Sequence, residues 1–199
     1  MTNEDNKKII NFLFEMGTMR KLPRMHRQNL LTDDMSDNIA THSYRVTLIG
    51  WFLAKMEKVE PYKVVMMCLA HDMSEVRSGD HNWVHKRYTK IFEDEIKKEQ
   101  LGQLPFEDLF ELSSEYEKRE SKEAIVAKDA DLLDQIFLLR EYVWQGNKEA
   151  QIWLDGKGED KINRQFKSLK TDSAKKLAKM AMETPPSDWW NDIFTHQNR

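Results

Sequence analysis

The amino-acid sequence predicts an all-α fold, and two observations lead to that prediction. The 199 residues include only 7 glycines and 5 prolines, together about 6%, where ordinary usage is about 12%. Sheet proteins need these residues in their tight turns, so a β-sandwich or a small barrel is disfavoured. Apolar residues instead recur three and four positions apart, which is the spacing of one helix face. We therefore expect a helical bundle.

The N-terminal part of the chain predicts three helices and a basic loop. Pro23 interrupts helical hydrogen bonding within that loop. Ser36 or Asp37 is a suitable capping residue for the second helix, and Pro61 suits the first turn of the third. The predicted segments are a helix over residues 3–19, the loop over 19–31, a helix over 36–56 and a helix over 61–76.

The rest of the chain predicts further helices, of which the longest, over residues 118–145, contains neither glycine nor proline. Gly79 marks a loop after the third helix, and Gly102 with Pro105 separates two amphipathic helices. Trp189 and Trp190 are expected in the core. The predicted segments are a loop over 77–83, helices over 86–101, 106–116, 118–145 and 147–156, a loop over 155–161 and a helix ending near residue 183.

No internal repeat or linker divides the sequence, so one all-α domain over residues 1–199 is the simplest assignment. Within it, the candidate functional residues lie in a central segment over 19–145, and we expect the C-terminal helices over 147–199 to pack on that segment. The tail after residue 184 closes the chain.

Charge and cysteine content exclude several functional classes. The formal net charge of −3 offers no overall attraction for a nucleic-acid backbone, so no nucleic-acid partner is expected. No segment approaches the roughly 18 apolar residues that span a bilayer, so no membrane partner is expected. The single cysteine, Cys68, lies in an apolar run and fits a buried position in a reducing compartment. The sequence thus predicts a cytoplasmic protein.

Three titratable side chains interrupt the apolar face of the predicted third helix. His71, Asp72 and Glu75 share that face with Val64 and Cys68. Burying such groups without hydrogen-bond or ionic partners costs free energy, so each of them needs a partner in the folded protein. A metal ion does so for imidazole and carboxylate together.

His42 and an aspartate of the longest helix extend this pattern. His42 occupies an apolar-face position of the second helix, where a hydrogen-bonded core histidine is the alternative interpretation. Asp131 lies on an apolar face of the longest helix, but periodicity does not select among Asp129, Asp131 and Asp134. Two histidines and two aspartates form a ligand set suited to one divalent transition metal ion, for which Mn, Co, Zn, Ni and Fe are all acceptable.

Three blocks in order, SDNIATHSYRV, LAHDMSEVRSGD and VAKDADLLDQ, resemble the HD-domain metal-dependent phosphohydrolases, and most closely their compact 5′-deoxynucleotidase-like type. The family's ligand order matches His42, then His71 and Asp72 after 29 residues, then Asp131 after another 59. The resemblance implies an all-helical domain, Asp131 as the last ligand, and a homodimer.

The same resemblance assigns catalytic roles to Glu75 and Asp80. In similar enzymes the matching carboxylates position or activate water and handle the leaving-group proton. A bound divalent ion lowers the pKa of its water, and a nearby carboxylate can orient that water toward phosphorus. The alternatives are a surface salt bridge for Glu75 and a simple turn residue for Asp80.

Substrate contacts are expected on both sides of the metal ligands. Arg24 matches the arginine that binds the substrate phosphate in such nucleotidases. Met25 stands where that type has a tryptophan, so the preference for deoxyribose stays open. Lys86 and Arg87, together with His81 and His85, follow the Gly79 loop and are further candidate substrate contacts.

The sequence therefore predicts a metal-dependent phosphohydrolase, a 5′-nucleotidase-like enzyme that removes phosphate from a nucleotide. The expected substrate is a nucleoside or deoxynucleoside 5′-monophosphate. One alternative is hydrolysis of another nucleotide phosphoester, such as a nucleoside triphosphate, a cyclic dinucleotide or a guanosine polyphosphate. A second alternative is a non-catalytic protein that binds metal and nucleotide.

Overall fold

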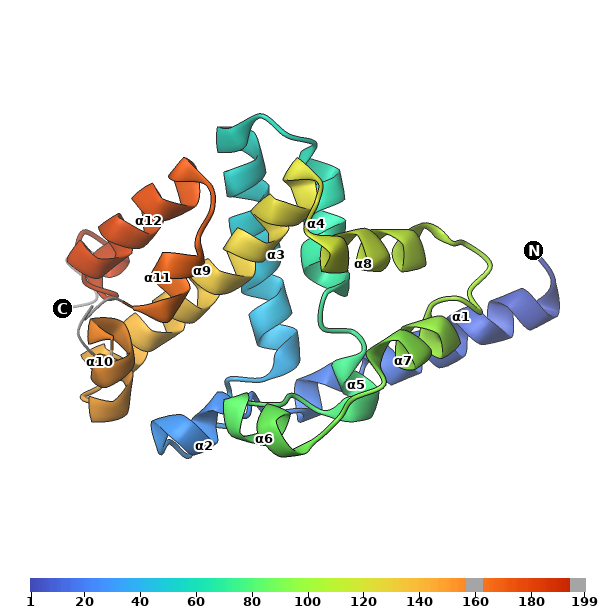
Figure 1. Cartoon of the computed structure of the whole chain (residues 1–199), viewed down its shortest axis with the longest axis horizontal. Helices are drawn as coiled ribbons and strands as arrows, with labels where there is room; N and C mark the ends of the chain where they lie inside the picture. The colour runs from blue at the N-terminus through green and yellow to red at the C-terminus, as the bar shows by residue number, and fades with distance from the viewer. Residues whose placement is uncertain (157–162, 194–199) are drawn as a thin grey trace.

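The computed structural model describes residues 1–156 and 163–193, and within them the chain is all-α, as the sequence predicts (Figure 1). These residues contain no strand, and an isolated bridge pairs Pro23 with Asn38. The elements are α1 (Asn3–Met16), η1 (Met19–Lys21), α2 (His26–Leu30), α3 (Ile39–Glu57), α4 (Pro61–Ala70), α5 (Glu75–Ser78), α6 (Trp83–Tyr88), α7 (Glu93–Gln100), α8 (Asp108–Lys118), α9 (Lys122–Trp144), α10 (Lys148–Asp155), α11 (Arg164–Ser168), α12 (Asp172–Glu183) and η2 (Asp188–Trp190).

Side-chain caps fix the starts of the helices that frame the site. Asn38 accepts a hydrogen bond from the backbone N–H of Thr41, and the Thr41 hydroxyl accepts one from the N–H of Asn38, so α3 begins with a capping box. Pro61 lies in the first turn of α4, where its missing N–H has no intrahelical partner to lose. A capping box also begins α1 at Thr2, and a side chain that accepts one backbone N–H begins α9, α10 and α12, at Ser121, Asn147 and Thr171.

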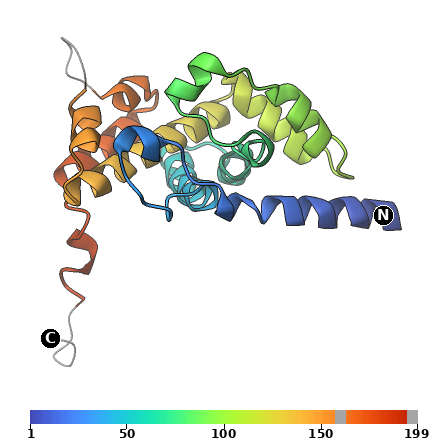
Figure 2. The same cartoon turned by 90° about the horizontal axis from the view of Figure 1, so that it is seen from below.

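The helices α3, α4 and α9 pack against one another at the centre of the molecule (Figure 1). Their contacting faces bury large aliphatic side chains almost completely, including Val46, Leu53, Val64, Leu133 and Leu139. The helices α10, α11 and α12 pack against the other side of α9. The helix α1 projects away from the body of the protein, with the N-terminus at its far end (Figure 2).

The predicted helix over residues 61–76 is wrong at its C-terminal end. The helix α4 ends at Ala70, and the short helix α5 begins at Glu75. Between them the backbone forms tighter bonds, because the N–H of Met73 donates to the carbonyl of Ala70 and the N–H of Glu75 donates to that of Asp72. These bonds span three residues rather than four, which replaces the α-helical pattern by 3₁₀-type turns.

Two other predicted segments contain more structure than expected. The predicted loop over 19–31 includes η1 and α2, and α2 ends where Leu31 adopts a positive φ of 52°. The predicted helix over 86–101 is divided into α6 and α7. Asn82 caps α6 by accepting bonds from the N–H groups of Val84 and His85, so α6 starts early and ends at an extended Thr89.

The longest helix, α9, begins at Lys122 rather than at residue 118, since Ser121 caps it and Arg119 has a positive φ of 55°. Trp189 and Trp190 are not core residues, because 72% and 43% of their surfaces are exposed. Part of the predicted loop over 155–161 and the last residue of the segment over 185–194 lie outside the described residues. None of the described helices combines the length and apolarity needed to cross a membrane.

We expect Gly50→Ala to lower the free energy of unfolding by about 1–3 kcal/mol. A Cβ atom at this position of α3 would lie 2.5 Å from the Cys68 Sγ and 3.2 Å from the Val64 Cγ1 of α4. Chemical denaturation of Gly50→Ala, Cys68→Ala and the double variant tests this. The double variant should lose less stability than the sum of the single losses, because Cys68→Ala removes the clashing sulfur. Strict additivity would contradict so close an approach of α3 and α4.

Candidate metal centre and active site

Four of the predicted site residues meet where the central helices come together. His42 projects from the first turn of α3, whereas His71 and Asp72 follow the end of α4. Asp131 lies near the middle of α9. Because α3 packs against both α4 and α9, residues separated by up to 89 positions in the sequence become neighbours.

The potential ligand atoms of these four side chains face one another. The Nε2 atom of His42 is 3.2 Å from the Nε2 atom of His71 and 3.4 Å from oxygens of both Asp72 and Asp131. The Nε2 atom of His71 is 3.1 Å from the Asp72 Oδ2 and 3.9 Å from the Asp131 Oδ1. His42, His71 and Asp72 offer atoms that all lie within 4.8 Å of one another. Such spacing suits ligands on one cation with bonds of about 2 Å.

Hydrogen bonds on the far side of each imidazole orient both rings toward this centre. The Nδ1 atom of His71 is 2.7 Å from the backbone carbonyl of Cys68, which only accepts, so Nδ1 carries the proton. The Nδ1 atom of His42 is 2.6 Å from the carboxylate of Asp134 and donates in the same way. Each neutral ring therefore directs an unprotonated Nε2 inward, and two such acceptors 3.2 Å apart require a shared cation or an added proton.

The surrounding carboxylates give the centre a strongly negative potential. Burial and the nearby Arg24 lower the pKa of His42, but hydrogen bonds to Asp131, Asp134 and Asp72 outweigh them and raise it well above the usual value. Burial raises the pKa of Asp72, but the two histidines outweigh it and hold that pKa well below the usual value. A divalent cation would replace the added proton and neutralise the same charge, so the residues present fit a metal ion.

The three aspartates that periodicity did not separate have three different environments. Asp131 faces the two histidines and also pairs with Lys128 at 2.6 Å. Asp134 faces away from the centre and binds the outer nitrogen of His42. Asp129 is 1% exposed and accepts hydrogen bonds from the backbone of Lys170 and from the backbone and hydroxyl of Thr171, at the start of α12.

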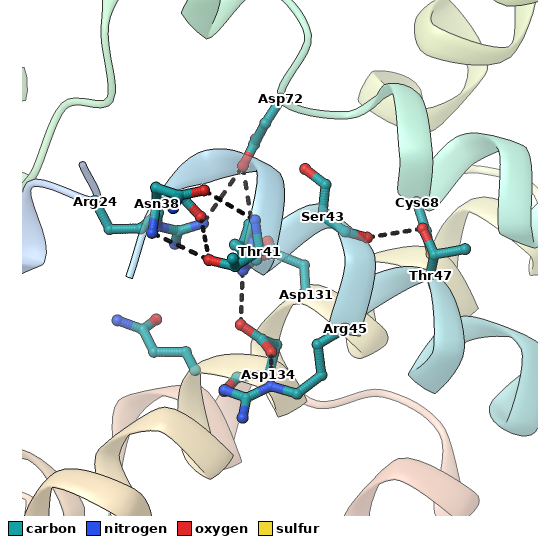
Figure 3. A network of polar contacts seen from close by, with 12 residues as sticks. Arg24, Asn38, Thr41, Ser43, Arg45, Thr47, Cys68, Asp72, Asp131 and Asp134 are labelled. Atoms are coloured by element: carbon teal, nitrogen blue, oxygen red, sulfur yellow. Dashed lines mark hydrogen bonds and ion pairs between the residues drawn. The ribbon is translucent and has the colours of Figure 1, made fainter. Parts of the chain in front are cut away.

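Arg24 points into the site from the segment between η1 and α2, and it is almost completely buried (Figure 3). Its guanidinium lies 3.5 Å from the Asp72 Oδ2 and 3.9 Å from the Asp80 Oδ2. Asp80 also accepts a hydrogen bond from the backbone N–H of Met25, and the Asn82 side chain donates to the Met25 carbonyl at 3.0 Å. Asp80 and Asn82 thus hold the Arg24 segment against the centre.

Glu75 supplies an unpartnered polar atom beside the ligand set. Its Oε2 atom is buried without a hydrogen-bond partner among the described residues. Burial, followed by the charges of Asp72 and Asp80, raises the pKa of Glu75 well above its usual value. The start of α5 therefore presents a carboxyl oxygen that a bound molecule can satisfy.

A pocket of about 1200 Å³ opens over these residues, and its lining includes Arg24, Asp72, Glu75, Asp80 and Asp131. Among the other predicted substrate contacts, His81 and Lys86 also line the pocket. The side chains of Met25, His85 and Arg87 are not among its lining residues. Arg87 instead lies at the end of α6 with its guanidinium 5.8 Å from the ring centroid of Tyr88.

The sequence analysis missed Arg45, which lies beside Asp134 in Figure 3. Its guanidinium donates to the Asp134 carboxylate and, at 2.5 Å, to Glu141. Helical spacing in the sequence could have identified Arg45, because His42 and Arg45 lie three residues apart on α3 and Asp134 and Glu141 lie seven residues apart on α9. Both spacings place the pair on one helix face.

The profile of the HD domain family matches residues 19–175. The chain therefore belongs to the HD domain family. Among named relatives, the 5′-deoxynucleotidase HDDC2 of Bos taurus is 29% identical over 161 residues, which cover 76% of this chain and 76% of that protein. The human protein of the same name is 30% identical over 146 residues, covering 68% and 69%. The protein of that name from Dictyostelium discoideum is 26% identical, and the chain spans only 64% of its length.

Solved structures share the fold at lower identity. A conserved hypothetical protein from Pyrococcus furiosus superposes with a TM-score of 0.70 at 24% identity, over 87% of this chain and 97% of that one. A Magnetospirillum magnetotacticum protein described as a predicted metal-dependent phosphohydrolase gives 0.67 at 22% identity, over 89% and 93%. Family membership and the named relatives together support a hydrolase.

We expect Asp129→Ala to lower the free energy of unfolding by about 1–3 kcal/mol, because the donors at the start of α12 lose their buried acceptor. Urea unfolding in the presence of a chelator measures this. Asp131→Asn, two residues away, is the matched control and should lower the stability of the metal-free protein by less, since the amide keeps the size of the side chain and gives up only its charge beside Lys128 and the histidines. The reverse order of stabilities would contradict the division of roles between the two aspartates.

Proposed function

We propose that the protein is a divalent-metal-dependent phosphohydrolase that removes phosphate from a nucleoside or deoxynucleoside 5′-monophosphate. The observation that carries the proposal is the pair of inward-facing Nε2 atoms, 3.2 Å apart, beside two carboxylates. In this proposal His42, His71, Asp72 and Asp131 hold one metal ion. Its identity among Mn, Co, Zn, Ni and Fe is left to metal analysis.

When bound, such an ion supplies a Lewis acid for the phosphoryl group and lowers the pKa of a water molecule. The remaining steps fall to side chains of the chain itself. Arg24 binds the phosphate oxygens as a buried guanidinium already held beside the centre. The free Oε2 of Glu75 accepts a hydrogen bond from the attacking water and orients it toward phosphorus.

Asp80 has two tasks in the proposed mechanism. Its Oδ2 atom accepts from the Met25 N–H and faces Arg24, so it keeps the phosphate-binding guanidinium in place. The carboxyl group also lines the pocket, from which it transfers a proton to the oxygen atom of the leaving alcohol. Lys86 lines the same pocket and supplies a further positive charge for the substrate.

A nucleoside monophosphate is favoured because the named relatives are 5′-deoxynucleotidases. A second candidate substrate is a nucleotide with additional phosphates. The pocket lining supports that alternative, since Arg164 and Lys170 belong to it and both side chains are exposed. Phosphate release from a panel of mono-, di-, tri- and cyclic nucleotides separates the two candidates.

We expect purified wild-type protein to contain about one divalent ion per chain and to release phosphate from a nucleoside 5′-monophosphate. Asp72→Ala should lose both properties, because it removes one of two carboxylate ligands and leaves only His42, His71 and Asp131 to hold the ion. Elemental analysis and phosphate release on the same preparations measure the two outcomes. Full activity in Asp72→Ala, or a wild type that binds no divalent ion under any loading condition, would refute the proposed function.

We expect Asp134→Ala to weaken metal affinity by about 10- to 100-fold without abolishing it. The change removes the acceptor that orients His42 but leaves all four proposed ligands in place. Competition with a chelator of known affinity measures the effect. Asp134→Asn is the matched control and should retain more affinity, because the amide oxygen still accepts from the Nδ1 atom. Unchanged affinity in Asp134→Ala would contradict this role.

A further inference from the structure

We propose that Trp153 and His26 form a subsite in which the nucleobase of the substrate stacks. The inference rests on the proposed function, because it assigns one end of the pocket to a part of a nucleotide. The two rings line the same pocket as the metal centre. Their centroids lie 5.8 Å apart and their planes are inclined by 81°, so the contact is edge to face.

The geometry of this aromatic pair leaves ring surface for a ligand. In an edge-to-face contact neither ring covers both faces of the other. Three aliphatic residues, Ile125, Leu132 and Ile152, belong to the same lining and add apolar surface to the pocket. A nucleobase is a flat, largely apolar ring system, and stacking on aromatic side chains is its common mode of recognition in proteins.

His26 adds a polar group to this apolar wall. Its Nδ1 atom is buried and lacks a hydrogen-bond partner among the described residues. Burial, assisted by the charge of Arg24, lowers the pKa of His26 to about 4, so the ring is neutral near pH 7. A neutral imidazole can stack on a base without competing for the phosphate, and its free nitrogen can pair with a polar edge of the base or with a sugar hydroxyl.

The position of His26 relative to the proposed phosphate site fits a nucleotide. Arg24 and His26 lie two residues apart and both line the pocket. The phosphate and the base of one molecule can therefore contact the same short segment. The side chain of Met25 between them is not part of the lining, so within this segment Arg24 and His26 are the residues that face the pocket.

Hydrogen bonds hold the backbone of Trp153 and the start of its helix in place. The Asn163 side chain donates to the Trp153 carbonyl at 2.8 Å, and that asparagine is 7% exposed. The helix α10 packs against α2 and α9, and the Asn147 side chain at its start donates to the Leu30 carbonyl at 2.8 Å. The backbone that carries the indole is thus fixed, which lowers the cost of ordering this wall of the pocket around a ligand.

The experiment compares Trp153→Ala and Trp153→Phe with two substrates, deoxyadenosine 5′-monophosphate and deoxyribose 5-phosphate, which lacks a base. Trp153→Ala should raise the KM for the nucleotide by roughly ten-fold, the size expected for one lost stacking contact. Its KM for the sugar phosphate should stay within about two-fold of wild type. Trp153→Phe should restore most of the affinity for the nucleotide. Thermal melting and metal content serve as checks on folding.

Trp83→Ala is the matched control, because Trp83 also lines the pocket but is 61% exposed and makes no ring contact among the described residues. It should change neither KM substantially. If Trp83→Ala instead of Trp153→Ala lost affinity for the nucleotide alone, or if Trp153→Ala weakened both substrates equally, the proposed subsite would be wrong. Should Trp153→Ala fail to fold, His26→Ala carries the same comparison of substrates.

Binding of deoxyadenosine, which has no phosphate, separates this proposal from the proposed function. Isothermal titration should detect it in the wild type and in Trp83→Ala, and should show at least a roughly ten-fold loss in Trp153→Ala. A wild type that binds deoxyadenosine in this way but hydrolyses no phosphomonoester would overturn the proposed function and leave the subsite. A wild type that hydrolyses the nucleotide and sugar phosphate equally well and does not bind deoxyadenosine would overturn the subsite alone.

Discussion

The centre of this fold depends on two imidazole rings whose acceptor nitrogens face each other at 3.2 Å inside the protein. The arrangement persists because each ring donates from its other nitrogen to a fixed acceptor, the Cys68 carbonyl or the Asp134 carboxylate. The end of α4 follows from the first of these bonds, since the Cys68 carbonyl lies in its last turn. The position of α9 follows from the second. Two nitrogen lone pairs and two carboxylates meet at this centre, so its charge balance requires a metal cation or an added proton.

Apolar periodicity was sufficient to predict the helices that build the core, because α3 and α9 bury continuous stripes of aliphatic residues. Apolar periodicity did not predict where α4 ends, because local hydrogen bonds change the backbone there without changing the spacing of the side chains. His71, Asp72 and Glu75 stay on one side of the chain whether they continue α4 or follow it in tight turns. The break between α6 and α7 was missed for a related reason, since residues 89–92 contain neither glycine nor proline.

For the candidate site, residue types and order in the sequence predicted which side chains come together, but not their partners. Periodicity left Asp129, Asp131 and Asp134 equivalent, because what distinguishes them is contributed by distant elements: the start of α12, the two histidines and the outer nitrogen of His42. The choice of Asp131 came from the resemblance to a family. Trp153 carried no signal at all in the sequence, because its place in the pocket arises from the packing of α10 against α2.

One helix therefore connects the stability of the protein with the geometry of the site. Within six residues, α9 holds the start of α12 through Asp129, faces the histidines through Asp131 and orients His42 through Asp134. A rotation of α9 that improved one of these contacts would spoil the other two, since their side chains leave the helix in different directions. The C-terminal helices that pack on α9 consequently do more than cover its apolar face. They hold the rotation of α9 at which an aspartate reaches the centre, and α10 and α11 contribute residues to the lining of the pocket.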